Sequence, residues 1–327
     1  MRLRATLPLI CLTVCFAPTN VIAAGKPAKL STIRVTSSLD KTAQPSMFWA
    51  PDSAKSKATP LLVFLHSWSG DYRQNNSKWF LAARKQGWMF LHPNFRGRND
   101  HPEACGSKKA RQDILDAMDW VFENYKVNSS RVYLAGTSGG GHMTMLMAAY
   151  FPNRFSAASA WVGISDLAEW YRFHTRTGKP GRYARMIIAS LNGPPGKSEK
   201  IDKDYRSRSP IFHLHRVGKL PLDLNAGVRD GKTGSVPIMH TLNAFNVIAR
   251  AGKHRTISQQ EIDQLWKTGK LTKPRPEDIA NDKSYGRKIL LRRHAGPARV
   301  TIFDGGHEGL VNPSITWLAK QRRKVSR

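Results

Sequence analysis

Short apolar runs rich in β-branched residues alternate along this chain with longer stretches in which apolar residues recur every three or four positions. Runs of the first kind are typical of buried strands, and stretches of the second kind are typical of amphipathic helices. Their alternation predicts an α/β fold in which a mostly parallel sheet carries helices on both faces. Eight strands are expected, at residues 31–37, 46–49, 60–66, 88–92, 131–136, 155–162, 220–228 and 298–303.

Five longer segments have the periodicity of helices. The clearest is 109–125, where Ile114, Ala117, Met118 and Val121 fall on one face. We expect this face to pack on the sheet rather than to bind a ligand. The remaining helices are predicted at residues 75–85, 139–150, 238–251 and 311–322.

Two stretches interrupt the alternation. Residues 163–215 are rich in Arg, Tyr, Gly and Pro, and residues 252–297 are dense in Lys and Arg. Within the second stretch, the capping-box pattern from Ser258 to Glu261 predicts a short helix that runs through Trp266. Neither stretch has enough periodic apolar residues for a core of its own. We therefore expect two insertions in a single domain that spans residues 25–327.

The first 24 residues have the three parts of a secretory signal peptide. Arg2 and Arg4 are basic, residues 5–17 are mostly apolar, and residues 21–24 offer small side chains for cleavage. The apolar run is shorter than the ~20 residues that cross a bilayer. No later stretch is apolar enough to span a membrane. The sequence therefore predicts a secreted or periplasmic protein without a membrane span in its mature part.

The composition restricts the class of protein further. The chain has 327 residues, of which 40% are hydrophobic, so a large core is available and a disordered chain is excluded. Its three cysteines fit neither a disulfide framework nor a zinc pattern, and we expect no metal or organic cofactor. The net charge of +29 favours acidic partners. Because no nucleic-acid motif accompanies the charge, nucleic acid is not an expected partner.

The segment Gly136-Thr137-Ser138-Gly139-Gly140 combines a nucleophile with the residues that a sharp turn requires. It stands directly between the expected strand 131–136 and the expected helix 139–150. A serine at such a junction is lifted above the sheet, and the glycines remove Cβ atoms that would collide in the turn. The pattern predicts Ser138 as the nucleophile. A phosphate-binding loop is the alternative, although neither GxGxxG nor GxxxxGK[ST] is present here.

A serine hydroxyl needs a base, and in this arrangement the base follows the serine along the chain. His307 is the expected base, because it comes just after the strand 298–303 and is flanked by glycines in Gly305-Gly306-His307-Glu308-Gly309. Those glycines allow the loop to fold back over the strand ends. His294 lies in a basic run and is expected to be solvated, whereas His142 is expected to pack within its helix.

The base in turn needs an acid that orients it. Asp230 is the expected acid, because it follows the strand 220–228 at the end where a carboxylate can reach the imidazole. Asp166 follows an earlier strand and is the alternative, while Asp223 lies within a strand. Asp230 is also compatible with a plain turn, since it precedes Gly231.

A developing oxyanion needs two N–H donors. One is the N–H of Gly139, which follows the nucleophile at the start of a helix. The second is expected in the loop after the strand 60–66, where Ser67 and Trp68 are the candidates. The side chain of Trp68 is equally compatible with a wall of the acyl pocket and with plain packing.

With these residues placed, the chain resembles the α/β-hydrolase superfamily, and within it the prolyl oligopeptidase (S9) catalytic domain and neighbouring secreted esterases. By this resemblance Ser138, Asp230 and His307 form the catalytic triad, and Arg96-Gly97 is a structural turn near the site. The likeness extends over about residues 60–320. Four features carry it: Pro93-Asn94-Phe95-Arg96-Gly97, the segment from Arg111-Gln112-Asp113 to Trp120, Gly136 to Gly140, and the pair Gly227 to Pro237 with Gly305-Gly306-His307.

The chain departs from the S9 pattern in ways that bear on its substrate. Family peptidases usually carry a β-propeller, for which the sequence has no room. Five residues separate Asp230 from Val236-Pro237, where the family has two, and no oxyanion tyrosine is evident beside residues 66–70. These differences weaken a peptidase interpretation more than a hydrolase interpretation.

The sequence therefore predicts an exported serine hydrolase that cleaves a carboxylic ester through an acyl-enzyme. A serine peptidase of the S9 family is the first alternative. The second is a non-catalytic protein that binds polyanions or carbohydrates, which the net charge suggests. The expected substrates are a small-molecule ester, a peptide or an acylated and acidic polysaccharide.

Overall fold

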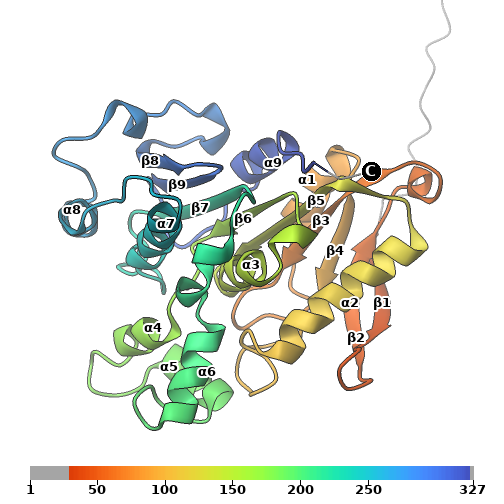
Figure 1. Cartoon of the computed structure of the whole chain (residues 1–327), viewed down its shortest axis with the longest axis horizontal. Coiled ribbons are helices and arrows are strands. Elements are labelled where there is room, and N and C mark those ends of the chain that lie inside the picture. The colour runs from red at the N-terminus through yellow and green to blue at the C-terminus, as the bar shows by residue number, and fades with distance from the viewer. Residues whose placement is uncertain (1–28, 325–327) are drawn as a thin grey trace, which may run out of the picture.

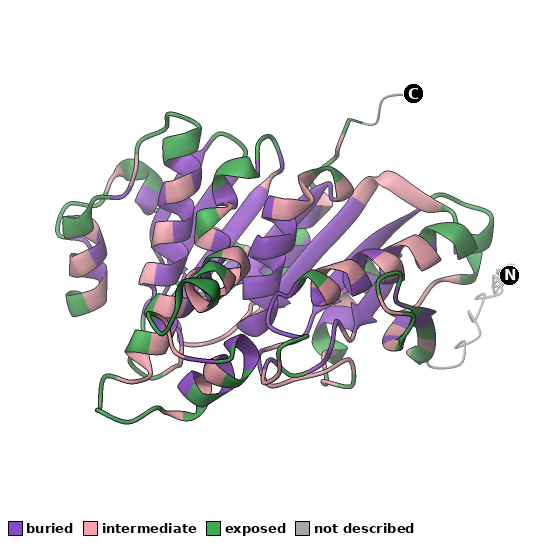
Figure 2. Ribbon diagram, turned by 60° about the horizontal axis from the view of Figure 1, so that its bottom comes forward, coloured by how far each residue is buried: buried purple, intermediate pink, exposed green. Residues whose placement is uncertain are grey.

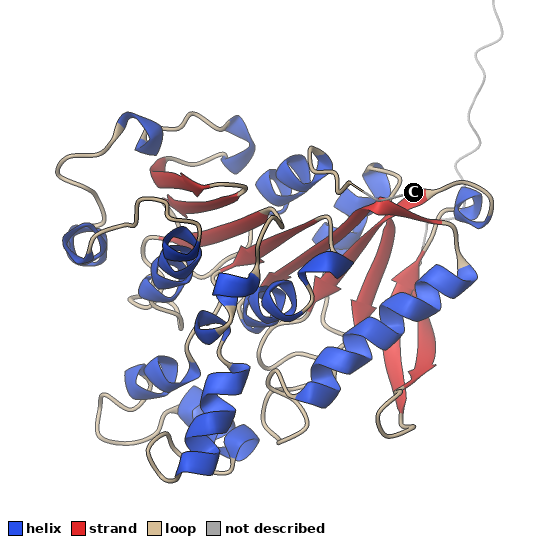
Figure 3. Ribbon diagram, in the orientation of Figure 1, coloured by secondary structure: helices blue, strands red, loops and turns tan. Residues whose placement is uncertain are grey.

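Nine strands form one sheet in the computed structural model, which describes residues 29–324 (Figures 1 and 3). Their order across the sheet is β1-β2-β4-β3-β5-β6-β7-β9-β8. Neighbours from β4 to β9 are parallel, whereas β1, β2 and β8 join antiparallel at the two ends. The expected mostly parallel sheet is confirmed. The strands are β1 (Ser31–Thr36), β2 (Ala43–Trp49), β3 (Thr59–Leu65), β4 (Met89–Pro93), β5 (Val127–Thr137), β6 (Ala157–Trp161), β7 (Leu222–Gly227), β8 (Ile289–Ala295) and β9 (Ala298–Phe303).

Helices cover both faces of this sheet, and the five predicted helices are present within a few residues of their expected bounds. One face carries α2 (Lys108–Asn124), α3 (Gly139–Tyr150) and α7 (Met239–Ala251), and the other carries α1 (Ser77–Lys85) and α9 (Val311–Ala319) (Figure 1). Parallel strands covered in this way are buried on both faces, which is why they read as continuous apolar runs.

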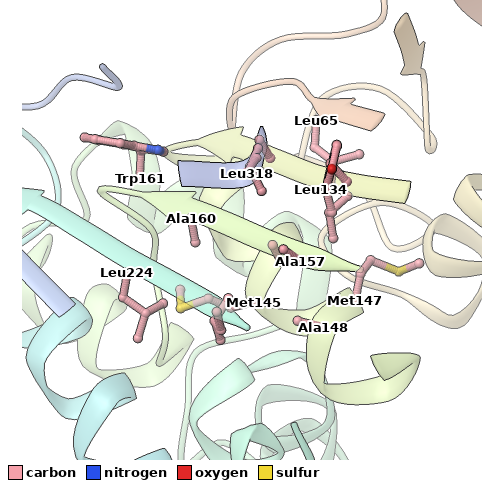
Figure 4. Packing of buried hydrophobic residues seen from close by; sticks show 14 of the residues in the cluster. Leu65, Leu134, Met145, Met147, Ala148, Ala157, Ala160, Trp161, Leu224 and Leu318 are labelled. Atoms are coloured by element: carbon pink, nitrogen blue, oxygen red, sulfur yellow. The ribbon is translucent and has the colours of Figure 1, made fainter. Parts of the chain in front are cut away.

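The core lies between the sheet and the helices of both faces (Figure 2). Every residue of β3, β4, β6, β7 and β9 is buried. Figure 4 shows Met145 and Ala148 of α3 beside β6, on the opposite side from Leu318 of α9. Helix α3 is buried almost all round, so the turn that precedes it is held from every side.

The ninth strand is a correction to the eight that were expected. It is β8, which lies inside the predicted insertion 252–297 and pairs with β9 at the sheet edge. The sequence does not indicate this strand, because Arg292 and Arg293 interrupt its apolar run. In the structure both arginines are nevertheless buried. The guanidinium of Arg293 binds both carboxylate oxygens of Asp278, each at 2.6 Å. A buried charge of this kind is stable only with its partner.

The other predicted insertion, 163–215, contains three helices that the sequence analysis did not resolve. They are α4 (Leu167–Phe173), α5 (Arg182–Leu191) and α6 (Glu199–Arg208), which stand together below the sheet in Figure 1. We call residues 163–209 the cap. Its apolar side chains, among them Trp170 and Ile187, form a small cluster apart from the main core. Trp68, Cys105 and Val236 of the main body complete that cluster, so the cap packs on three loops of the body.

The helix expected after Ser258 is confirmed as α8 (Gln259–Thr268), with Ser258 and Glu261 forming the capping box. Within residues 29–324, no helix combines the length and apolar character needed to cross a bilayer. The predicted signal peptide, residues 1–24, lies outside the described residues.

The pair Arg293–Asp278 gives a test of how β8 is held. Asp278→Ala removes the buried carboxylate that binds two nitrogens of the Arg293 guanidinium and leaves only the more exposed Glu261 and Glu277 beside it. We therefore expect the free energy of unfolding to fall by about 3 kcal/mol in denaturant titration. Asp119→Ala is the matched control, because it breaks an ion pair with Arg154 whose two side chains are 35% and 49% exposed. That variant is expected to lose less than about 1 kcal/mol. Equal losses in the two variants would contradict this account of β8.

Candidate active site

Ser138 occupies a strained turn between β5 and α3. Its backbone angles, φ of 61° and ψ of −118°, lie outside the regions that residues other than glycine ordinarily adopt. The turn is tight because a Cβ on Gly136 would lie 2.4 Å from the carbonyl oxygen of Gly140. A Cβ on Gly140 would lie 2.1 Å from the carbonyl oxygen of Leu65. Only glycine fits at these two positions, which explains the spacing around Ser138.

Three side chains from distant parts of the chain meet above this turn. The Nε2 atom of His307 lies 2.9 Å from Oγ of Ser138, and its Nδ1 atom lies 2.8 Å from Oδ2 of Asp230. A carboxylate only accepts, so Nδ1 carries the hydrogen and Nε2 accepts from the serine hydroxyl. The structure therefore brings together the three residues expected from the sequence, in the order hydroxyl, imidazole and carboxylate.

Asp230 is fully buried, and its second oxygen is also occupied. Oδ1 accepts from the backbone N–H groups of Gly231, at 2.9 Å, and Val236, at 3.1 Å. These bonds fix the carboxylate while Oδ2 remains free for His307. The five residues between Asp230 and Val236 thus form a loop that folds back onto the acid it follows.

The same loop, residues 231–235, contains a functional candidate that the sequence analysis missed. The hydroxyl Oγ of Ser235 lies 3.4 Å from Nε2 of His307, on the same side as Ser138. The backbone carbonyl of Ser235 accepts from Nε1 of Trp170, at 2.7 Å, and from Nε2 of His174, at 2.9 Å. The cap is therefore bonded directly to the loop that holds the acid. The lengthened Asp-to-Val-Pro spacing was the available signal, because it marks this loop as unusual.

The backbones of Gly139 and Trp68 meet beside the nucleophile. A Cβ on Gly139 would lie 2.3 Å from the backbone nitrogen of Trp68. No described residue accepts a hydrogen bond from that nitrogen, whereas the N–H of Ser67 donates to Oε1 of Gln74 at 2.8 Å. The geometry thus favours Trp68 over Ser67 as the partner of Gly139 in an oxyanion hole.

The indole of Trp68 packs rather than lines a pocket. Its side chain is buried, and its ring lies 4.7 Å from that of Trp170 in an edge-to-face arrangement. This contact anchors the cap to the loop that follows β3. Of the two side-chain roles left open by the sequence, the structure favours packing.

The other candidates from the sequence are occupied elsewhere. Asp166 caps α4 by accepting from the N–H groups of its first turn, and Asp223 pairs with Arg299 at 2.6 Å. His142 donates to the carbonyl of Arg208 at 2.7 Å, and burial lowers its pKa to about 4. His294 is exposed on β8. Within residues 29–324, no group of three or more His, Cys, Asp or Glu side chains is arranged to hold a metal ion.

Residues 74–262 match the sequence profile of the prolyl oligopeptidase family. The match covers more than half of the chain. The chain belongs to the prolyl oligopeptidase family. Membership confirms the resemblance drawn from the sequence and, together with the sheet, the α/β-hydrolase fold. It also indicates a serine hydrolase.

Individual members and neighbours of this family are similar over parts of the chain. Over 219 residues, 61% of this chain and 26% of the relative, the sequence is 27% identical to acylamino-acid-releasing enzyme 1 of Oryza sativa subsp. japonica. Over 51 residues, 16% of this chain and 17% of the relative, it is 45% identical to acetylxylan esterase A of Emericella nidulans. The chain thus spans about a quarter or less of the length of these curated relatives.

Among solved structures, the acylaminoacyl peptidase of Pyrococcus horikoshii has a similar fold. The comparison gives a TM-score of 0.55 at 20% identity and covers 71% of this chain and 37% of that chain. At this identity the likeness concerns the fold alone. The family's catalytic fold is thus present here with a cap of three helices and a ninth strand.

The close packing of the loop 231–235 makes the site sensitive to a methyl group added at Gly234. A Cβ on Gly234 would lie 2.3 Å from Oδ1 of Asp230 and 2.6 Å from Cβ of His307. We expect Gly234→Ala to displace the acid and lower the rate of labelling by a fluorophosphonate at least tenfold. Gly306→Ala is the matched control beside His307, because its Cβ would meet only Oγ1 of Thr233, at 3.7 Å. A control as slow as Gly234→Ala would show that the loop has no special part.

Proposed function

We propose that this protein is an exported serine hydrolase that cleaves carboxylic esters through an acyl-enzyme. The observation that carries the proposal is the hydrogen-bonded series from Oγ of Ser138 through the imidazole of His307 to the carboxylate of Asp230. Residues 25–327 then act as a single catalytic domain with two insertions. Two N–H groups, those of Trp68 and Gly139, complete the set that acyl transfer requires.

In the first half of the reaction, Oγ of Ser138 attacks the ester carbonyl while Nε2 of His307 takes the hydroxyl proton. The carbonyl oxygen becomes an oxyanion that the N–H groups of Trp68 and Gly139 stabilise. The carboxylate of Asp230 stabilises the imidazolium that forms. When the tetrahedral intermediate collapses, the bond to the alcohol breaks and His307 gives that alcohol its proton. An acyl group remains on Ser138.

In the second half, water replaces the alcohol. His307 takes a proton from the water, the oxygen attacks the acyl carbonyl, and collapse returns the proton to Oγ of Ser138. The products are a carboxylic acid and the free enzyme. The hydroxyl of Ser235 lies beside Nε2 of His307, where the alcohol leaves and the water enters. We propose that it helps to hold these two groups.

Two observations support an ester, and in particular an acylated polysaccharide, as substrate. The 51-residue match at 45% identity is to a protein named as an acetylxylan esterase. The net charge of +29 favours a substrate that bears acidic groups, because a cationic surface raises the local concentration of an anionic polymer. Export, which residues 1–24 predict, would bring the enzyme to such a polymer outside the cytoplasm.

Peptide hydrolysis is the second candidate function. It is favoured by the family match and by the 27% identity to an acylamino-acid-releasing enzyme. Both reactions pass through the same tetrahedral chemistry, so the triad does not separate them. The leaving group distinguishes the two reactions, because an alcohol leaves from an ester and an amine leaves from a peptide.

The nucleophile is tested by labelling with a fluorophosphonate and by turnover of p-nitrophenyl acetate. Ser138→Ala is expected to abolish labelling and to lower turnover by at least a thousandfold. Ser53→Ala is the control, because Ser53 is an exposed serine before β3, whereas Ser138 follows the parallel strand β5 at the opposite end. The rates of this control should equal those of the parent. Labelling that survives in Ser138→Ala would eliminate the proposed mechanism.

The substrate class is tested by comparing two kcat/KM values in the same preparation. An ester hydrolase should turn over acetylated xylan oligosaccharides at least a hundredfold faster than acetylated dipeptide anilides. The reverse ratio would assign the protein to the peptidases. Ser138→Ala should remove whichever activity is found, which ties that activity to this site.

A further inference from the structure

A cavity of about 580 Å³ lies at the edge of the sheet opposite the triad. It is bounded by the segment before β6, the segment before β7 and the chain that follows α9. Ser138, Asp230 and His307 follow the ends of β5, β7 and β9, which run parallel. Strand β7 has six residues, so the cavity and the triad are about 20 Å apart along the strands.

The polar part of this cavity is cationic. Five of its lining residues are basic: Arg216, Lys219, Arg322, Arg323 and Lys324. No carboxylate of residues 29–324 lines it, and none of the five forms an ion pair within that range. Other arginines of this chain are neutralised by carboxylates, as in Arg293 with Asp278. The cavity thus concentrates positive charge that the described residues leave uncompensated.

One of these cations, Arg323, is held in place by hydrogen bonds to the protein. The side chain of Arg323 donates to the carbonyls of Asn153 and Ser129, and its backbone N–H donates to Ser130 at 3.0 Å. Burial and the nearby charge of Arg154 lower the pKa of the Arg323 guanidinium. By contrast, Lys219 and Arg216 are exposed, and the side chain of Arg216 bonds only to its neighbour His215. The cavity therefore combines a cation that is fixed by backbone carbonyls with cations whose side chains can adjust to a ligand.

The rest of the lining includes apolar side chains, and several of these come from the same segment as Arg216 and Lys219. They are Pro152, Phe155, Val217, Leu220 and Pro221. Phe155 is buried, so no aromatic ring protrudes from this lining. Cations beside apolar side chains suit a ring that carries a carboxylate, because guanidinium and carboxylate form paired hydrogen bonds while the ring covers the apolar groups.

From this arrangement we infer a second binding site, remote from the triad, for the carboxylate groups of an acidic polysaccharide built from uronic acid units. The choice of a polysaccharide rests on the proposed function, whereas the anionic class rests on the cavity alone. A polymer held here leaves the catalytic edge uncovered. The site would then keep the enzyme on an acidic polymer while the triad acts on acyl groups.

Two other polyanions fit the observations less well. Single-stranded nucleic acid is bound by stacking bases on accessible aromatic rings, and the aromatic residue of this cavity is buried. An anionic membrane surface is flat and engages a protruding basic face, whereas these cations line a hollow. Binding of either of these polyanions is measured in the same test.

The test measures binding of a galacturonate oligosaccharide to the full chain in the Ser138→Ala background, so that no substrate is consumed. The pocket variant carries Arg216→Glu and Lys219→Glu. The control carries Lys78→Glu and Lys85→Glu, two exposed lysines of α1, and so has the same net charge. We expect the dissociation constant to rise at least tenfold in the pocket variant and less than twofold in the control. Binding should also weaken with added salt.

Equal affinity in the two variants, or no binding of the oligosaccharide by the parent, would overturn the inference. So would tighter binding of a single-stranded oligonucleotide or of anionic phospholipid vesicles that is lost in the pocket variant, because the site would then take another class of polyanion. Turnover of p-nitrophenyl acetate, measured with Ser138 intact, should be the same in both variants. A chain that binds the oligosaccharide but hydrolyses no ester would refute the proposed function and leave this site in place.

Discussion

The hydrogen bond from Oγ of Ser138 to Nε2 of His307 forms only if most of the fold is in place. It joins residues 169 positions apart, and a shift of an ångström in either would break it. The bond forms because β5, β7 and β9 are parallel, so that the segments after them all emerge at one edge of the sheet. It is held because α3 is buried on nearly every side and cannot tilt. A packed sheet therefore supplies the precision that a flexible loop could not.

The two predicted insertions, residues 163–215 and 252–297, contact this site in different ways. The cap reaches it through Trp68, which contacts Trp170, and through the carbonyl of Ser235, which accepts from Trp170 of α4 and from His174, the residue after that helix. The loop that contains Trp68 and the loop 231–235 are thus tied to the same part of the cap. The second insertion adds β8 beside β9, and its Arg287 pairs with Glu308, the residue next to His307. Each insertion therefore supports a loop that the parallel strands alone would leave at an open edge.

Arginine has opposite roles in different parts of this chain. Inside the protein, Arg96 and Arg293 are buried with carboxylate partners and join segments that are distant in sequence, such as the turn at residues 94–97 and α2. At the surface, most cations have no such partner and give the molecule its basic character. The same residue type thus contributes to the fold where it is paired and to recognition where it is not.

The sequence by itself predicted Ser138, His307 and Asp230 as the candidate triad and the positions of the central strands, because each prediction rests on a short local pattern. Glycines around Ser138 and His307 are required by close backbone contacts, and apolar runs are required by burial on two faces. Only the tertiary structure favoured Trp68 over Ser67, placed Ser235 beside His307 and showed β8. These depend on which N–H already has an acceptor, on how a loop folds back, and on charges such as that of Arg293 that become buried only with a distant partner. No local pattern records such contacts, because they form between segments that meet only in the folded chain.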